Sequence, residues 1–400
     1  MTNLFLDLHL IQTVPPSCVN RDDTGAPKKA VYGGVQRHRV SSQAWKYVAR
    51  RYLHEVASVD LATRSRRHPV ALVRLAQEAD PTVDAAAAAV AAAEVVKSLT
   101  SPKSGTLKVK DADLAAALEQ VETEEAEDTA AEGAEDEEGR EAKAVVVSLS
   151  GAERRALAAV VLEVARKITA GGKVDRAKDI NAPATAALVG AAQAADQHLF
   201  GRFIAGTPEA KVEAAVHVAH ALSTHAAYSE DDAYTAVGDP EPGDNIQRGA
   251  DFLDVAEFVS STLYRYVRLD LGDLLEQYGP EEVAELTGQV AEAFALSMPG
   301  GKGAGFAPDS VPAVVTAVLR SDRPVSAAQA FEAPVRSAEG YESASVQRLA
   351  SFLANVDASG MVAAPLAVAT ASIAHDPIGD RLAGRLSASV ADLVRPALAA

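Results

Sequence analysis

The chain has 400 residues, 48% of them hydrophobic, and a formal net charge of −17. This length and apolar content are enough to bury a large core and allow two or three structural units. The single cysteine, Cys18, excludes an internal disulfide and favours a reducing compartment. The sequence shows no secretory leader and no apolar run long enough to cross a membrane. We therefore expect a soluble cytoplasmic protein with no membrane partner.

The first predicted element is a strand over residues 3–12. Leucine recurs at every second position from Leu4 to Leu10, which is typical of one face of a strand. The intervening positions, such as Asp7 and His9, belong to the other face. A polar, turn-rich loop follows from Ser17, and a helix comes after it. A strand, an ordered loop and a helix in this order suit the start of a ferredoxin-like βαββαβ unit.

The helix after this loop is predicted to begin near Ser41 or Ser42, either of which can cap its free N–H groups. Apolar residues at helical spacing give the helix one buried face: Trp45, Val48, Ala49, Tyr52, Leu53 and Val56. Lys46 and Arg50 stand four residues apart on a different face, so their cationic ends point the same way.

The stretch from Arg21 to His54 is strongly basic. It holds eight Lys or Arg and two Asp, a formal charge of +6 within an acidic chain. The free N–H groups of the helix start, the serine hydroxyls and the Gln43 amide are natural donors to a phosphate. Lys46 and Arg50 would bracket the same anion. The alternative is a solvated basic face on an amphipathic helix.

Residues 59–195 are rich in alanine, which favours helix and predicts a helical insertion. Within it, residues 111–142 hold fourteen acids and one base, a formal charge of −13 that leaves −4 for the rest of the chain. The net charge is therefore a poor guide to the binding surface. We expect a mobile loop over this acidic run because it has few apolar residues. Ser150 and Glu153 form a capping-box pattern that predicts a helix through Ile168.

Strand-forming residues return after this block, over 198–204, 212–222 and 257–269. The acidic, Gly- and Pro-containing stretch 226–249 lies between the last two and predicts an extended β-hairpin or arm. Further helices are predicted from about Ala184, at about 280–297 and at about 341–355, with a strand over 311–319.

The glycine-rich segment Pro299–Phe306 is a second candidate phosphate contact. It is not a Walker A motif, because Lys302 is followed by glycine and not by Ser or Thr. Its backbone N–H groups could nevertheless approach a phosphate, with Lys302 as a point charge. A flexible turn is the alternative interpretation.

Other candidate chemistry is weaker. His217 and His220 would face opposite sides of a strand and could not share one ion with His225, so we expect no metal and no cofactor. Asp22 and Asp23 are interpreted as loop-structuring residues with Asx-turn bonds. Phe5 is the one clear candidate for stacking on a base, which favours a protein that holds a nucleic-acid backbone and does not read bases.

The N-terminal region resembles a known family. The run SCVNRDD, then a basic residue, then YGG with RHRVSSQAWK is similar to the signature of the backbone subunit of type I-E Cascade, the CRISPR surveillance complex (CasC, or Cse-type, family). The similarity is densest over residues 3–51. Weaker similarities follow at Leu199–Phe203, His217–His225, Thr235–Val237, Tyr264–Tyr266 and Arg323–Phe331.

The resemblance implies an α+β fold with a modified ferredoxin-like (RRM-like) palm, a helical fingers insertion and a β-hairpin thumb. The palm would comprise residues 1–58, 196–222 and 252–400, the fingers 59–195 and the thumb 223–251. It also implies a non-enzymatic subunit in antiviral defence that polymerises along the spacer of a CRISPR RNA. The expected partners are the CRISPR RNA, the target DNA strand paired to this guide, neighbouring copies of the chain and other Cascade subunits.

Charge pattern and resemblance together predict these RNA-binding residues: Asn20, Arg21, Lys28, Lys29, Arg39, Ser41, Ser42, Gln43, Lys46, Arg50 and Lys302. No catalytic residue is predicted. Two alternatives stay open. Backbone subunits of type III CRISPR complexes cleave target RNA through a loop aspartate, for which Asp22 or Asp23 is the candidate here. The other alternative is a general single-strand RNA-binding protein that acts outside any complex.

Overall fold

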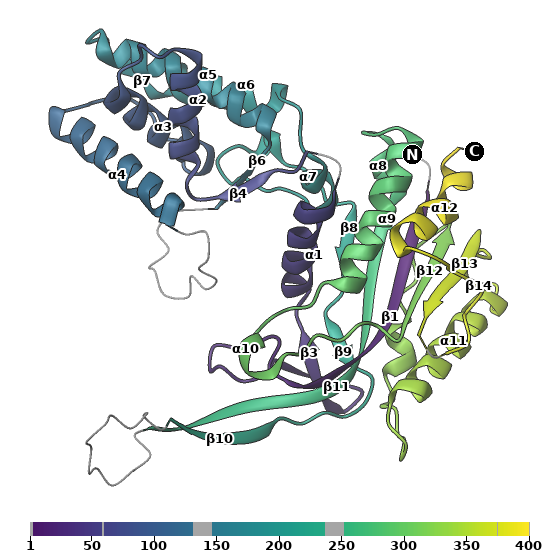
Figure 1. The fold of residues 1–400 in the computed structure, drawn as a ribbon. Helices are drawn as coiled ribbons and strands as arrows, with labels where there is room; N and C mark the ends of the chain where they lie inside the picture. The colour runs from purple at the N-terminus through teal and green to yellow at the C-terminus, as the bar shows by residue number, and fades with distance from the viewer. Residues whose placement is uncertain (1–2, 58–59, 131–145, 237–251, 374, 400) are drawn as a thin grey trace, which may run out of the picture. The chain divides into compact units, whose positions relative to one another are not determined.

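The computed structural model of the chain describes residues 3–57, 60–130, 146–236, 252–373 and 375–399. It divides into two compact units. Residues 1–57 and 215–400 form the first, which we call the sheet unit, and residues 58–214 form the second, the helical unit (Figure 1). None of the described helices is long and apolar enough to span a membrane.

Ten described strands of the sheet unit form one sheet with β1 (Phe5–Ser17) near its middle. β1 runs antiparallel to β11 (Phe252–Asp270) on one side and to β12 (Val314–Arg320) on the other. Beyond β12 lie β13 (Ala367–Ser372) and β14 (Asp380–Arg381). On the side of β11 lie β8 (Val216–Val218), β9 (Ala221–Ser223), β10 (Glu230–Ala236), β3 (Val35–Val40) and β2 (Lys29–Tyr32).

Both faces of β1 are buried because helices cover each side of the sheet. On one face, Arg265 of β11 lies opposite Leu10 and contacts α1 (Ser42–Val56) and α9 (Pro280–Leu296). The short α8 (Leu271–Leu275) leads into α9, and α12 (Leu386–Leu398) packs on α9 (Figure 1). On the other face, Ile11 joins an apolar cluster with α11 (Glu342–Ala358) and the 3-10 helix Ala327–Phe331. The predicted first strand is confirmed, and residues 6–12 are buried on both of its faces.

The predicted basic helix is also confirmed. Ser41 is the N-cap of α1, and its hydroxyl accepts a hydrogen bond of 3.2 Å from the amide nitrogen of Ala44. Trp45, Ala49 and Leu53 are buried along one side of the helix, as the apolar spacing predicted. The opposite side is therefore left to the charged residues.

The helical unit is built from α2 (His68–Ala79), α3 (Ala85–Thr100), α4 (Asp111–Ala130), α5 (Gly151–Thr169), α6 (Ala182–Gly190) and α7 (Ala195–Phe200). Two short strand pairs, β4 (Thr63–Ser65) with β6 (Val147–Leu149) and β5 (Thr106–Leu107) with β7 (Val174–Asp175), join these helices. A π-helical turn, Arg176–Asn181, precedes α6. The core includes the small side chains of α3, which let neighbouring helices approach closely. The capping box of Ser150 and Glu153 is confirmed at the start of α5.

The expected mobile loop over the acidic run is wrong for residues 111–130, which form α4. Asp111 and Asp113 stand in its first turn, where the helix dipole favours carboxylates. Val121 is buried in the core of the unit and anchors this helix by apolar contact. Residues 131–142 lie outside the described residues.

The strand predicted over 198–204 is wrong as well, because residues 195–200 form α7. The side chain of Gln197 accepts a hydrogen bond of 2.8 Å from the amide nitrogen of Ala194 and so closes the first turn of that helix. The strand predicted over 212–222 is present only as β8 and β9. The C-terminal elements β13, β14 and α12 were not predicted.

An antiparallel pair extends from the sheet unit at β10, where Glu230–Ala236 pair with Phe252–Phe258 of β11. This is the strand pairing that an extended hairpin requires, and Figure 1 shows it projecting from the sheet. Residues 237–251 lie outside the described residues. The assignment of palm, fingers and thumb roles to these parts stays a prediction.

Candidate functional site

The loop that follows β1 is organised by Asp22. Its Oδ1 accepts hydrogen bonds from the amide nitrogen of Thr24 (3.0 Å), the hydroxyl of Thr24 (2.6 Å) and the amide nitrogen of Ala26 (3.1 Å). These bonds, led by that of the Thr24 hydroxyl, lower the pKa of Asp22. The Asx-turn interpretation of Asp22 is confirmed, whereas Asp23 is exposed beside it.

Asn20 ties this loop to the basic helix. Its side-chain oxygen accepts a hydrogen bond of 2.9 Å from the amide nitrogen of Ser41, and its carbonyl accepts one of 2.9 Å from the amide nitrogen of Lys28. Ser41 is 6% exposed; its hydroxyl caps α1 and its amide nitrogen bonds to Asn20. Ser42 and Gln43 are the more accessible residues of this first turn.

Lys46 and Arg50 lie one turn apart on α1, both partly exposed. Partial burial lowers the pKa of the Lys46 amine. Lys46 lies in the second turn of the helix and Arg50 in the third, so both follow the first turn, where the helix dipole is positive. An anion at this end would meet charge and free N–H groups together.

The β2–β3 hairpin adds a second group of cations. Nη1 of Arg39 lies 3.3 Å from Nδ1 of His220, and burial together with Arg39 and Lys28 lowers the pKa of His220. Lys29, on the neighbouring strand, contributes to the lowered pKa of Asp22. The hairpin therefore places Lys28, Lys29 and Arg39 next to the loop that Asp22 organises.

The glycine-rich segment lies against this same loop. The amide nitrogen of Gly301 donates to the carbonyl of Val19 (3.3 Å), and a Cβ at Gly301 would stand 2.5 Å from the carbonyl oxygen of Cys18. Only glycine permits this approach. Lys302 comes next, at the start of the short α10 (Gly303–Phe306). Burial raises the pKa of Cys18, while Lys302 and Arg21 act in the opposite direction, so both cations lie near the Cys18 thiol.

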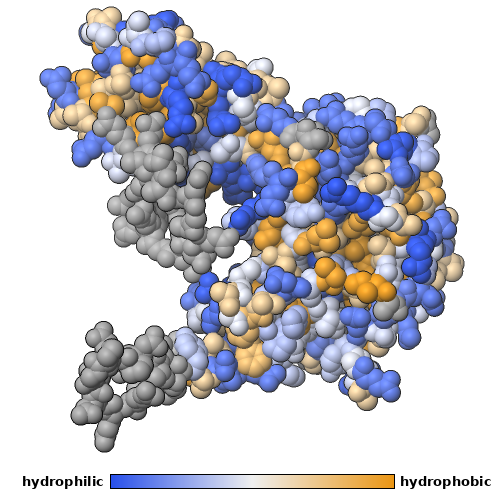
Figure 2. All heavy atoms as spheres, viewed as in Figure 1, coloured by the Kyte–Doolittle hydropathy of each residue, from blue (hydrophilic) through white to orange (hydrophobic). Residues whose placement is uncertain are grey.

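We define the basic surface as Asn20, Arg21, Lys28, Lys29, Arg39, Ser42, Gln43, Lys46, Arg50 and Lys302. The hydrogen bonds of Asn20 join its loop to α1 and to β2, and Gly301 brings Lys302 to the same loop. Ser41, the remaining predicted residue, is buried and links the loop to α1 through its bonds to Asn20 and Ala44. Hydrophilic side chains are spread over the face of both units seen in Figure 2, so charge locates this surface better than hydropathy does.

Two buried arginines close to this surface play internal roles that charge counting missed. Arg37 is fully buried and donates to the carbonyls of Tyr32, Ser223, Phe331 and Glu332. It therefore does not add to the basic surface. The carbonyl of Glu332 lies so close to Gly33 that a Cβ there would stand 1.7 Å from it. Arg265 is the second, and it lies beneath α1.

The three histidines weighed as metal ligands have separate environments. His225 is buried and stacks on the ring of Tyr341 at 3.7 Å, His220 contacts Arg39, and His217 is exposed on β8. Within the described ranges, no group of three His, Cys, Asp or Glu residues is placed to hold a metal ion.

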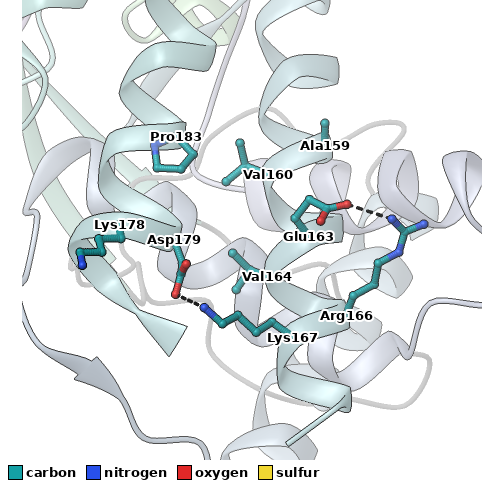
Figure 3. A pocket seen from close by; sticks show the side chains of 9 residues that line it. All are labelled: Ala159, Val160, Glu163, Val164, Arg166, Lys167, Lys178, Asp179 and Pro183. Carbon is teal, nitrogen blue, oxygen red and sulfur yellow. Dashed lines mark hydrogen bonds and ion pairs between the residues drawn. The ribbon is translucent and has the colours of Figure 1, made fainter. Parts of the chain in front are cut away.

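A groove of about 680 Å³ lies in the helical unit, between α5 and the segment that leads into α6 (Figure 3). Four of its charged residues form two ion pairs with each other. Nζ of Lys167 lies 2.6 Å from Oδ2 of Asp179, and Nη1 of Arg166 lies 2.9 Å from Oε1 of Glu163. None of the predicted binding residues lines it.

Comparison with known proteins shows extensive similarity. A family model described as "CT1975-like protein" matches residues 6–394. No curated protein matches the sequence. A solved structure titled "CRISPR RNA-guided surveillance complex, pre-nicking" contains a chain that is 28% identical, with a TM-score of 0.75 over 98% of this chain and 100% of that one. Another, titled "CRISPR RNA-guided surveillance complex", contains a chain that is 25% identical, with a TM-score of 0.67 over 99% of both chains.

Proposed function

The chain belongs to the CT1975-like protein family, and we propose that it is an RNA-binding backbone subunit of a CRISPR RNA-guided surveillance complex of the type I-E Cascade kind. The observation that carries this proposal is the basic surface. Its cations come from one loop, one hairpin, one helix and a glycine-rich segment about 280 residues away in the sequence. An acidic chain that gathers cations in this way has an anionic partner of matching extent.

The surface suits a phosphate backbone better than bases. Its donors are Lys and Arg side chains, a helix N-terminus and backbone N–H groups, which recognise phosphate without regard to sequence. Trp45 is buried and is not free to stack on a base. Sequence recognition then falls to pairing between the guide and its target DNA strand, as in other RNA-guided effectors.

The test is co-expression of the tagged chain with a guide RNA and the other subunits of its complex. We expect the purified material to contain the guide, several copies of the chain and the partner subunits, with RNA of many spacer sequences bound equally well. Binding of the chain alone to arbitrary single strands, without partner subunits, would support a general RNA-binding protein instead.

We further propose that the arm formed by β10 and the first half of β11 acts as the thumb and contacts the next copy along the guide. Residues 231–234 are exposed, so the β10 strand of the arm is not part of the core. Deleting Asp232–Asp244 should leave the melting temperature near that of the parent and abolish assembly of full-length complexes. Normal assembly of the deletion variant would contradict the thumb assignment.

The absence of catalysis in this chain is also a proposal. Oδ1 of Asp22 accepts three hydrogen bonds within its own loop, which gives that carboxylate a structural role. The assembled complex should leave complementary RNA and DNA intact in Mg²⁺ or Mn²⁺ unless a separate nuclease is added. Regularly spaced cuts that disappear in Asp22→Ala or Asp23→Ala would favour the type III-like alternative.

A further inference from the structure

Arg265 is a buried cation whose described partners are all neutral. It lies on β11 with 2% of its surface exposed, and its guanidinium carbon stands 3.5 Å from the ring centroid of Trp45. Nη1 donates to Oε1 of Gln12 at 2.5 Å, and Nη2 donates to the carbonyl oxygen of Phe294. Burial lowers the pKa of Arg265 to about 9, so the group still carries its charge at neutral pH.

Such a group opposes folding unless its contacts offset the loss of hydration. An apolar side chain of similar length would fill the same space without that cost. Arg265 therefore has a role that an apolar residue could not fill, and the segments that its hydrogen bonds connect indicate this role.

Gln12 connects Arg265 to the glycine-rich segment through hydrogen bonds. While its Oε1 receives Arg265, its Nε2 donates to the carbonyl of Ser310 (2.7 Å) and to its hydroxyl (3.2 Å), and lies 3.5 Å from Sδ of Met298. Met298 and Ser310 flank the stretch 299–309, which contains Lys302. One amide therefore holds both ends of this segment.

Trp45 makes the connection to the basic helix. It precedes Lys46 and lies one turn after the capping residue Ser41, and its ring rests on the guanidinium of Arg265. Arg265 thus touches α1 directly and the glycine-rich segment through Gln12. Both parts belong to the basic surface, although they lie far apart in the sequence.

We propose that Arg265 is a positioning residue that fixes the spacing between the cations of α1 and Lys302, so that they meet successive phosphates of one RNA strand. It does not touch the RNA. The proposal rests on the RNA-binding function proposed above. Positioning by Arg265 would preorganise the surface, since a surface whose donors are already spaced for the ligand loses less entropy on binding.

The matched variants are Arg265→Met and Arg320→Met. Arg320 is also an arginine buried to about 1% exposure, but it lies on β12 and contacts Asp357 of α11 at 3.0 Å and Asp7 at 3.7 Å, away from the basic surface. Gln12→Met serves as a second variant, because it leaves the Arg265 contact with Trp45 in place and removes the amide that joins Arg265 to Ser310 and Met298.

The measurement is binding of a guide-length RNA at several salt concentrations. We expect Arg265→Met and Gln12→Met each to weaken binding about tenfold and to reduce the salt slope by about 0.7, the contribution of one phosphate on a single strand. The RNA affinity of Arg320→Met should be within twofold of that of the parent, even if this variant loses as much melting temperature as Arg265→Met or more. Trp45 is the only tryptophan in the chain, so its fluorescence reports directly on the Arg265 contact in the folded variants.

A double-mutant cycle then tests the coupling itself. Lys46→Ala and Lys302→Ala should have non-additive effects on RNA binding in the parent and additive effects in the Gln12→Met background. The positioning role alone would be overturned if the parent chain binds RNA and the folded Arg265→Met and Gln12→Met variants bind it with the same affinity as the parent. A parent chain that binds no RNA would remove the proposed function as well.

Discussion

The amide nitrogen of Ser41 donates a hydrogen bond of 2.9 Å to the side-chain oxygen of Asn20. This bond joins the loop after the first strand to the N-terminus of the basic helix, so the two cannot move independently. The donors at the helix start that we propose bind phosphate are thereby oriented by a residue 21 positions earlier in the sequence.

Two substitutions at Asn20 should distinguish its contribution to folding stability from the effect of local charge on RNA binding. Asn20→Ala removes the acceptor for Ser41 and is expected to lower the free energy of unfolding by about 1 kcal/mol, measured by urea denaturation. Asn20→Asp keeps an acceptor oxygen and should retain most of this stability. It should nevertheless weaken RNA binding, because it adds a negative charge beside the proposed phosphate path. Equal RNA affinity in Asn20→Asp and the parent would place Asn20 away from that path.

Lys46 and Arg50 should contribute to RNA binding through charge alone. Lys46→Ala with Arg50→Ala is expected to weaken binding about equally for unrelated RNA sequences. The salt slope should shrink by about 1 to 1.5 units, since each phosphate on a single strand contributes about 0.7. Binding titrations at four or more salt concentrations measure this change.

The matched control for this pair is Arg381→Ala with Arg395→Ala, which removes the same charge from β14 and α12. Arg381 is exposed, and Arg395 is partly exposed and pairs with Glu281 at 2.8 Å. The control should leave the slope unchanged. If both double variants change it equally, net charge and not the basic surface governs binding.

Lys302 and Ala307 adopt left-handed backbone conformations, with φ of 49° and 43°. This conformation costs about 1–2 kcal/mol for an L-residue, and the greater unfolded-state entropy of glycine offsets about 0.5–1 kcal/mol of that. Lys302→Gly and Ala307→Gly should therefore each stabilise the protein by about 0.5–1 kcal/mol in urea denaturation. Only Lys302→Gly should weaken RNA binding. Similar losses of affinity in both variants would indicate that backbone stiffness, not the lysine charge, matters here.

Ionisation of Glu292 should make the free energy of unfolding of the sheet unit depend on pH in the acid range. Its carboxylate accepts hydrogen bonds from Arg385 (2.6 Å), the hydroxyl of Ser387 (2.7 Å) and the hydroxyl of Tyr52 (3.2 Å). The bond from Arg385 is the main reason that the pKa of Glu292 is lowered from 4.5 to about 2. A lowered carboxyl pKa stabilises the fold above pH 4.5, and this stabilisation is lost as the pH falls toward 2.

Glu292→Gln is accordingly expected to cost about 1–2 kcal/mol at pH 7, because Arg385 is largely exposed and its charge is partly screened. The difference from the parent should shrink between pH 4.5 and pH 2 in urea denaturation. Glu281→Gln, which breaks an exposed pair with Arg395, should change stability little at any pH. A Glu292→Gln cost that stays constant with pH would rule out the ionised carboxylate as its source.

The sequence by itself determined the local features of the site. The spacing of Trp45, Ala49 and Leu53 defined the buried face of α1, and the serine before it defined the cap, because neighbours three or four residues apart decide both. The Asx turn at Asp22 was likewise predictable, since its donors lie within four residues. The same local reasoning failed for residues 111–130, where packing of Val121 into a core built from other helices offset an acidic composition.

Only the tertiary structure decided which cations form the surface. Arg37 and Arg265 are as basic in sequence as Lys46, yet carbonyls and rings supplied by distant segments enclose both of them. Lys302 joins Arg21 because Gly301 lets two backbones approach where a Cβ would clash. Burial and long-range contact depend on how segments hundreds of residues apart pack together, and no local pattern of residues encodes that packing.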